Sequence, residues 1–448
     1  MRPGLLWSGL LALSLLIPQP LRAERVIVRD AEIESYLREL AGPLMAAAGL
    51  DAEGVRLYVV RDPRINAGVA GGPNLFLNTG LLRATRSPEE LAGVLAHELA
   101  HIQGGHLARL GRRIERARLQ ALLGALLGTA AAFAGAPEAA AALLLGGQSL
   151  AQEQLLRFTR TQESAADQAA VAILRDAGYP ASGLVSFLEE LDRRRFLAGL
   201  AEEVYLRTHP LTRERIRSLK ARLAAQGAPQ PSAFGPALRL RHQRVVAKLE
   251  GFLEDPQRVL NTRTGADFTD RYARAIALFR SGRGEGAAEL LRTMLGENPE
   301  DPYLWELYGQ VLFESGRGRE ALAPYRRAVA LAPREPLIRL GLARVLVETA
   351  SRSELEEARV LLQEVVAVDP DNAFAYRLLG IALGRLEDYG GSFLALTEWA
   401  LLVHRVKDAE LYLKRADAKL GADDPRRLRL EDLRREVERI SPEQKRGR

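Results

Sequence analysis

A repeat in the second half of the chain places the strongest constraint on its fold. Pro299 and Pro333 are 34 residues apart, and so are Gly282 and Gly316. This is the period of tetratricopeptide repeats, in which each copy is a pair of helices that buries its apolar face against the next copy. The second half of the chain is therefore predicted to be an α-helical solenoid.

A third copy is offset by three residues, because Pro370 follows Pro333 by 37 residues. Small residues recur ten positions after each proline, where helices are expected to cross closely: Gly309, Ala343 and Gly380. We expect the repeat domain to span residues 270–425, with a degenerate fourth unit and a final helix near 407–420 as caps, ahead of a charged tail at 426–448. Such solenoids present concave surfaces for peptides or proteins, although a purely structural array is the alternative.

The pentapeptide HELAH, from His97 to His101, supplies part of a zinc site. Two histidines four residues apart on a helix lie on one face and can bind one metal ion, with Glu98 beside them facing the metal-bound water. The start of this helix is marked by an N-cap serine, a first-turn proline and a capping-box acid: Ser87, Pro88 and Glu90. The alternative is a chance match in a charged helix.

The third ligand is expected from ESAAD, residues 163–167. Glu163 can reach the metal from a second helix, and Asp167, one turn later, can accept a hydrogen bond from the far nitrogen of His97. His106 lies one residue before the position that the metzincin pattern requires, which Leu107 holds. We therefore expect His106 to pack beside the ligands, and we predict one zinc ion per chain. The remaining histidines, His242 and His404, lack ligand-type neighbours and are expected in the core or in solvent.

Four motifs in order identify a family: INAGVAGGPNLFLNTGLL, HELAHIQGGH, ESAAD and THPLTRERI. The chain resembles the gluzincin metallopeptidases of the HtpX and Ste24 type and, with its repeats, the periplasmic proteases of the BepA type. The resemblance implies a mainly α fold, in which a gluzincin-type metalloprotease domain with a small β-sheet, at residues 24–225, precedes the tetratricopeptide-repeat solenoid. Gly68 and Val69 depart from the family pattern, where bulkier residues are common.

The resemblance also implies a catalytic role for His209, in THPLTRERI. In one reading His209 donates a hydrogen bond to the oxyanion. In another it swings onto the zinc and displaces the water, which makes the enzyme latent. A third alternative is a histidine that stabilises the local chain. Glu98 is expected to take the proton of the zinc-bound water and pass it to the leaving amine.

Two segments before the zinc helix, VRLYVVRD and PNLFLNTG, have the pattern of short strands separated by a glycine-rich turn. A sheet edge binds extended peptide through backbone hydrogen bonds, so low sequence specificity is expected. Asn66, Gly71 and Asn74 are candidates for substrate contact, or equally for turn geometry.

The first 23 residues have a basic start, an apolar stretch and Ala23, which predicts a cleavable secretory signal, with an uncleaved anchor as the alternative. The periplasm follows as the location. The chain has no cysteine, so it is neither a lipoprotein nor disulfide-bonded. Its net charge of +6 is spread without interleaved aromatic residues, which argues against nucleic-acid binding.

Residues 119–149 are rich in alanine and glycine and almost free of charge. They predict a helical hairpin. The hairpin is either a buried pair of core helices, a lid or membrane-touching flap over the active site that gives peripheral membrane contact, or a two-span membrane insertion. Residues 226–269 are expected to form a linker and a basic helix between the domains.

Together these features predict a periplasmic zinc endopeptidase, and the resemblance to the BepA-type proteases implies that it degrades misfolded or misassembled polypeptides in outer-membrane protein quality control. The repeats are expected to bind clients or the outer-membrane protein assembly machinery. The alternative is a chaperone-like adaptor with a mostly latent zinc site.

Overall fold

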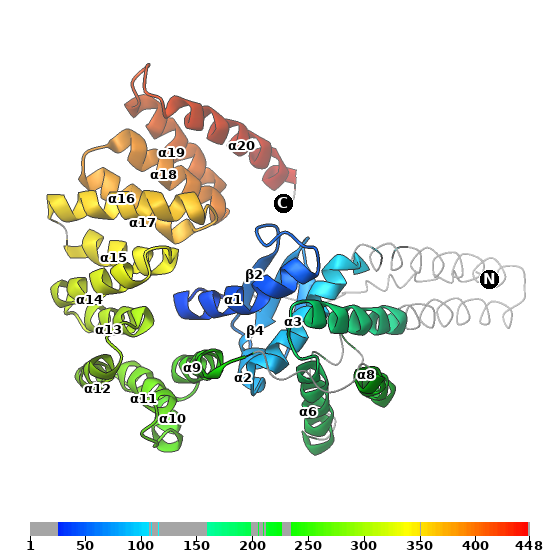
Figure 1. The fold of residues 1–448 in the computed structure, drawn as a ribbon. Coiled ribbons are helices and arrows are strands. Elements are labelled where there is room, and N and C mark those ends of the chain that lie inside the picture. The colour runs from blue at the N-terminus through cyan, green and yellow to red at the C-terminus, as the bar shows by residue number, and fades with distance from the viewer. Residues whose placement is uncertain are drawn as a thin grey trace, which may run out of the picture.

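The computed structural model describes residues 26–106, 109, 115, 159–198, 205, 209, 212–225, 234–349 and 351–446. The N-terminal domain holds a small sheet, and the repeats form an arc beside it (Figure 1). The predicted signal and the hairpin at 119–149 lie outside the described residues. In the part of the chain that is described, no helix is long and apolar enough to span a membrane.

The sheet has four strands in the order β1-β2-β4-β3. Their bounds are Ile27–Val28 for β1, Arg56–Val60 for β2, Ala67–Ala70 for β3 and Asn74–Asn78 for β4. The predicted strands are confirmed as β2 and β4, which pair in parallel with Tyr58 opposite Phe76. Strand β3 was missed by the sequence pattern. It pairs antiparallel with β4 and lies at the edge of the sheet.

Helices pack on the face of the sheet that carries Leu75 and Leu77, both fully buried. Those in contact with the sheet are α1 (Ala31–Ala47), α2 (Thr79–Ala84) and α3 (Pro88–Gln103). A helix over residues 159–176 follows in the chain, α6 (Ser182–Ala198) packs on α3, and α8 (Arg213–Ala225) packs on α6. Helices α3 and α6 cross at two glycines. A Cβ on Gly93 would lie 2.6 Å from the Leu184 backbone, so only glycine allows this approach.

Helix α3 begins as predicted, because Ser87 Oγ accepts a hydrogen bond from Glu90 N. The Glu90 carboxylate accepts from Arg86 N at 2.8 Å, one residue before the N-cap. The HELAH segment therefore lies well inside a capped and almost fully buried helix, which fixes the directions of its side chains.

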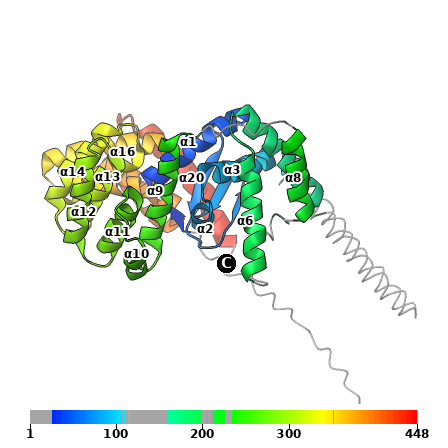
Figure 2. The ribbon, with the colours of Figure 1, turned by 60° about the horizontal axis from the view of Figure 1, so that its bottom comes forward.

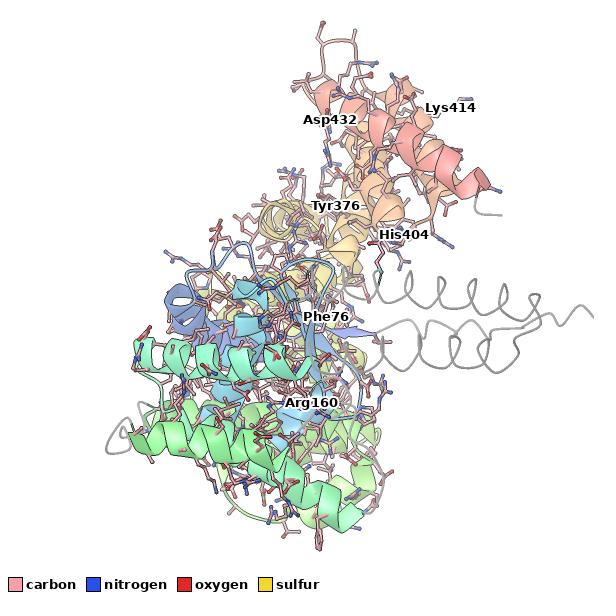
Figure 3. All side chains as sticks on the ribbon, turned by 90° about the vertical axis from the view of Figure 1, so that its right-hand side faces the viewer. Phe76, Arg160, Tyr376, His404, Lys414 and Asp432 are labelled. Atoms are coloured by element: carbon pink, nitrogen blue, oxygen red, sulfur yellow. The ribbon has the colours of Figure 1, made fainter. Side chains whose placement is uncertain are left out.

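The segment predicted as a linker and basic helix contains α9 (Pro236–Leu253) and α10 (Pro256–Thr262). His242 on α9 is a core histidine: its Nδ1 lies 2.8 Å from Tyr36 Oη and its Nε2 lies 3.0 Å from Thr85 O. His404 is exposed in the repeat domain, at the turn after α18 (Figure 3).

The predicted solenoid is confirmed as successive antiparallel helices. They are α11 (Phe268–Arg280), α12 (Gly284–Glu297), α13 (Pro302–Glu314), α14 (Gly318–Leu331), α15 (Pro336–Thr349), α16 (Arg352–Val368), α17 (Ala373–Arg385), α18 (Tyr389–Leu402) and α19 (Val406–Lys419). The segment predicted as a charged tail instead forms α20 (Arg427–Arg446), which buries Leu430 and Leu433.

The repeated residues have identifiable roles. Gly282 and Gly316 adopt φ of +78° and +82° in the turn between paired helices, a conformation that favours glycine. A Cβ on Gly309 would lie 2.7 Å from the Tyr325 ring, which explains the small residue at the helix crossing. Trp305 Nε1 donates to Pro299 O at 2.9 Å and so ties the start of α13 to the preceding proline, and Arg339 contacts Pro333 O in the same way before α15.

Helix α1 enters the inner side of the arc (Figures 1 and 2). Ala31 packs against Ala328 and Ile338 of the repeats. Glu32 is buried, 2.6 Å from Arg244 Nε, and it accepts a hydrogen bond of 2.7 Å from Tyr272 Oη. The two domains therefore share a buried polar interface rather than a flexible connection.

Acidic residues before the first helices of three successive repeats line this interface. Asp301, Glu335 and Asp369 are 34 residues apart and precede α13, α15 and α17. Each contacts an arginine from outside the repeats: Arg244 contacts Asp301, Arg38 contacts Glu335 at 2.9 Å, and Arg29 contacts Asp369 at 2.8 Å. The solenoid thus places one docking carboxylate on each of three successive repeats.

Candidate metal centre

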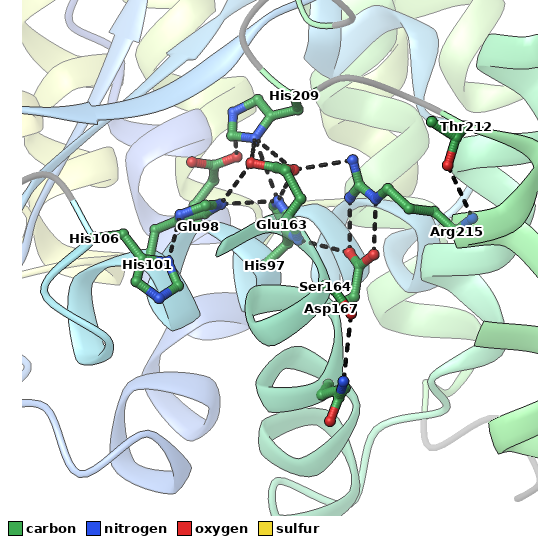
Figure 4. A network of polar contacts seen from close by, with 11 residues as sticks. His97, Glu98, His101, His106, Glu163, Ser164, Asp167, His209, Thr212 and Arg215 are labelled. Atoms are coloured by element: carbon green, nitrogen blue, oxygen red, sulfur yellow. Dashed lines mark hydrogen bonds and ion pairs between the residues drawn. The ribbon is translucent and has the colours of Figure 1, made fainter. Parts of the chain in front are cut away.

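Three histidines and one glutamate converge beneath the sheet edge (Figure 4). One ligand atom each from His97, His101, Glu163 and His209 lies within 4.8 Å of the others, and these are the residues that form a potential metal site in the described part of the chain. Helix α3 supplies the two histidines, and the helix over residues 159–176 supplies Glu163. The predicted ligands are thus brought together, with His209 as a fourth member.

The spacing of these atoms fits a tetrahedral metal ion. His97 Nε2 lies 3.1 Å from His101 Nε2 and 3.3 Å from His209 Nδ1. Glu163 Oε1 lies 3.4 Å from His101 Nε2 and 3.2 Å from His209 Nδ1. Ligands bonded at about 2.0–2.1 Å to a tetrahedral zinc ion are about 3.3–3.4 Å apart. A cation would also satisfy the nitrogen lone pairs that face one another here.

Asp167 lies behind His97, and its role in orienting that ring stays a prediction. Its Oδ1 is 3.1 Å from His97 Nδ1, the distance that the predicted orienting role requires. Burial lowers the pKa of His97, but Asp167 and Glu163 outweigh burial and raise it to about 10. Without a metal ion this imidazole binds a proton, and a metal ion competes with that proton for Nε2.

Arg215 completes the carboxylate network and was missed by the sequence analysis. Its Nη1 lies 2.9 Å from Glu163 Oε2, and its Nε and Nη2 donate to Asp167 at 2.8 Å each. The side chain is 9 % exposed, so these bonds form in a desolvated site. Arg215 leaves Glu163 Oε1 directed at the histidines. Its place six residues after His209 in THPLTRERI was the available signal.

Glu98 and His209 lie on the other side of the cluster. Glu98 is 1 % exposed, and its Oε1 lies 3.4 Å from His209 Nε2. The His209 ring stacks on the fully buried Tyr205, with ring centroids 4.7 Å apart, and His209 N donates to Tyr205 O at 2.8 Å. Tyr205 was also missed, because no local pattern marks it.

The candidate substrate residues lie at the edge of the sheet. Gly71 adopts φ of +63° in the turn between β3 and β4, and Asn74 Nδ2 donates to Gly71 O at 2.7 Å, so both residues shape this turn. Asn66 O accepts from Asn78 N at 3.0 Å just before β3. His106 contacts His101 from outside the cluster.

Comparison with known proteins places this site in a family. Residues 28–223 match the model of peptidase family M48. The N-terminal domain is therefore similar to the peptidases of family M48. Residues 288–411 match the repeat domain of a cytochrome c-type biogenesis protein H.

Relatives share both domains. The beta-barrel assembly-enhancing protease of Yersinia pestis is 27% identical over 95% of this chain and 88% of its own length. That of Escherichia coli is 25% identical over 94% and 87%. A mitochondrial metalloendopeptidase of Schizosaccharomyces pombe is 29% identical over 41% of this chain and 51% of its own length. The chain is therefore a metalloprotease, similar to the beta-barrel assembly-enhancing proteases.

Proposed function

We propose that the chain is a zinc-dependent endopeptidase whose ion is held by His97, His101 and Glu163. The observation that carries this proposal is the convergence of four ligand atoms at tetrahedral spacing beside the buried carboxylate of Glu98. Nitrogen and carboxylate ligands in this number are those of catalytic zinc sites. When bound, zinc supplies Lewis-acid chemistry and lowers the pKa of a water molecule.

The residues of this chain then divide the work of peptide hydrolysis. Glu98 takes a proton from the attacking water and returns it to the leaving amine. Arg215 holds one oxygen of Glu163, which keeps the other oxygen available as a ligand. Asp167 fixes the tautomer of His97. An extended polypeptide is held as an added strand along β3, with Asn66, Gly71 and Asn74 shaping that edge.

His209 sets whether the site is open. Its Nδ1 lies 3.3 Å from His97 Nε2 and 3.2 Å from Glu163 Oε1, which is the place of a fourth ligand. This supports a latch that excludes the attacking water until the segment around residue 209 moves. In the open state, the same imidazole could donate to the oxyanion through Nε2.

We further propose that the protein acts in the bacterial periplasm after removal of residues 1–23. The related beta-barrel assembly-enhancing proteases support a role in outer-membrane protein quality control, with misfolded or misassembled polypeptides as substrates. The repeat domain supports binding of clients or of the assembly machinery. The position of His209 favours one alternative, a chaperone-like adaptor whose zinc site stays mostly closed.

Glu98→Gln tests the proposal. The variant should keep about one zinc ion per chain and lose cleavage of an unfolded polypeptide, because the amide cannot accept the water proton. Glu53→Gln, exposed before β2, is the matched control and should cleave normally. A Glu98→Gln variant that still supports function in cells would favour the adaptor. Wild-type protein that is active without metal would refute the zinc peptidase.

A further inference from the structure

The end of helix α3 turns back so that His106 meets a metal ligand. His106 Nδ1 lies 2.9 Å from His101 Nδ1, and the ring centroids are 4.9 Å apart with planes at 79° (Figure 4). His106 is 7 % exposed, although it follows a helix end. The contact is thus a partly buried interaction between ring nitrogens, on the side of His101 that faces away from the cluster.

The two glycines of HIQGGH make this contact possible, each in a different way. Gly104 caps α3 with ordinary helical φ and ψ, so its backbone does not require glycine. A Cβ there would lie 2.5 Å from His106 Nε2, so the missing side chain is the space that the His106 ring occupies. Gly105 has φ of +59°, the left-handed conformation that reverses the chain after a helix.

The chemistry of a metal ligand fixes the direction of the hydrogen bond. His101 Nε2 faces the cluster and must offer its lone pair to the ion, so His101 Nδ1 carries the proton. His106 Nδ1 is the acceptor that lies within reach. The two histidine ligands therefore have different partners, since His97 faces the carboxylate of Asp167 and His101 faces a neutral ring nitrogen.

We propose that His106 is a positioning residue that holds His101 in its metal-binding tautomer and orientation, and that Gly104 and Gly105 serve this contact. The proposal rests on the metal site proposed above and assigns a role to the HIQGGH segment beyond the HELAH motif. Partners of this kind govern metal affinity, because a ligand ring that is free to rotate or to change tautomer binds the ion less tightly.

Substitutions at His106 test the proposal through zinc affinity, measured by competition with a chromogenic chelator. His106→Leu removes the acceptor and should weaken zinc binding by roughly 10–100-fold. His106→Asn should restore most of the affinity, because Oδ1 of asparagine takes the place of Nδ1. His106→Gln is the matched control, since its oxygen falls near the place of Nε2, and it should resemble leucine. Unfolding midpoints of the metal-free proteins separate this effect from loss of structure.

Gly104→Ala provides a second test that leaves His106 in place. The added Cβ should displace the ring and weaken zinc binding in the same direction, while in a His106→Leu background it should have no further effect. Equal affinities of wild type and His106→Leu, or equal losses in the asparagine and glutamine variants, would overturn the role of His106. A wild-type protein that binds no zinc would instead overturn the metal site itself.

Discussion

Two buried polar clusters, the metal centre and the domain interface, are built on opposite principles. In the metal centre, lone-pair donors face one another: His97 Nε2 lies 3.1 Å from His101 Nε2 and 3.3 Å from His209 Nδ1. Their charges are not balanced within the cluster without a proton or a cation. This convergence supports the bound cation proposed above.

In the domain interface, acids alternate with bases. Lys248 Nζ lies 2.7 Å from Asp30 and 3.3 Å from Glu32, and Arg244 contacts both Glu32 and Asp301. These acids and bases pair with one another, so this part of the interface needs no ligand. Loss of one member leaves another charge buried and unpaired, which costs folding free energy. Burial and charge alone therefore do not identify a metal site. Several lone-pair donors that converge on one point do.

The first prediction separates the two clusters most strongly. His97→Ala should lower zinc content from about one ion per chain to nearly none, with a loss of affinity beyond the 10–100-fold typical of an orienting partner. Cleavage should stop, as it should for wild type after a chelator. Urea unfolding of the chelated proteins measures separately the cost of losing the buried imidazole and its ion pairs with Asp167 and Glu163. A variant that keeps its zinc would refute the ligand assignment.

The interface should respond in the opposite way. Lys248→Met leaves Asp30 and Glu32 without their ammonium partner and should lower the free energy of unfolding by about 3–5 kcal/mol. Its zinc content should stay at the wild-type level. Lys220→Met, which removes an exposed pair with Glu189, is the control and should cost at most about 1 kcal/mol. Equal effects of the two changes in urea unfolding would show that the interface is not a buried network.

His209 tests how the metal centre is kept closed. If the imidazole is a latch, His209→Ala should raise basal cleavage of a loosely folded substrate while zinc content stays nearly unchanged. If it is instead an oxyanion donor, the same change should lower the rate by roughly 10²–10³. Rates measured beside zinc stoichiometry distinguish these results, and a large fall in rate would eliminate the latch.

The sequence predicted those parts of both regions that depend on local spacing. His97 and His101 share a face because four residues make about one helical turn. The repeats could be predicted because each copy places the same kind of residue at the same structural position. Gly282 and Gly316, for example, both adopt positive φ in the turn between paired helices. Strand β3 was missed because Ala67–Ala70 consists of small residues without a strong strand pattern.

The missed residues depend on contacts between distant segments. Arg215 contacts Glu163 and Asp167, 52 and 48 residues before it, and its place in THPLTRERI marks the residue but not these partners. At the interface, Asp301 caps α13, and this local role conceals its contact with Arg244. When a residue already has a local role, such as capping a helix, its sequence context gives no sign of a second contact with a distant segment.

Glu306 should make the interface sensitive to pH. Its Oε2 is buried without a hydrogen bond to a described residue. Burial raises its pKa to about 8; Lys248 opposes this shift, and Asp30, Glu32 and Glu335 add to it. The folded state therefore holds a proton that the unfolded state loses near pH 4.5.

It follows that this group lowers stability as the pH rises from about 4.5 to 8, by up to about 1.4 kcal/mol per pH unit. Glu306→Gln should remove that part of the decline and be more stable than wild type at pH 8, as measured by urea unfolding across the pH range. Parallel pH profiles for the two proteins would show that Glu306 ionises without cost.

The smallest effects are expected at the rim of the interface. Arg38 and Arg29 are 54% and 40% exposed in their pairs with Glu335 and Asp369, so water and salt screen them. Replacing either arginine with alanine should cost at most about 1 kcal/mol, and the double variant about the sum. In about 1 M salt, where charges are screened within roughly 3 Å, these losses should vanish, whereas the loss in Lys248→Met should persist. Urea unfolding at low and high salt measures both. If the rim variants stay destabilised at high salt, the rim belongs to the buried network, and the acids of successive repeats bind the N-terminal domain more tightly than exposed pairs do.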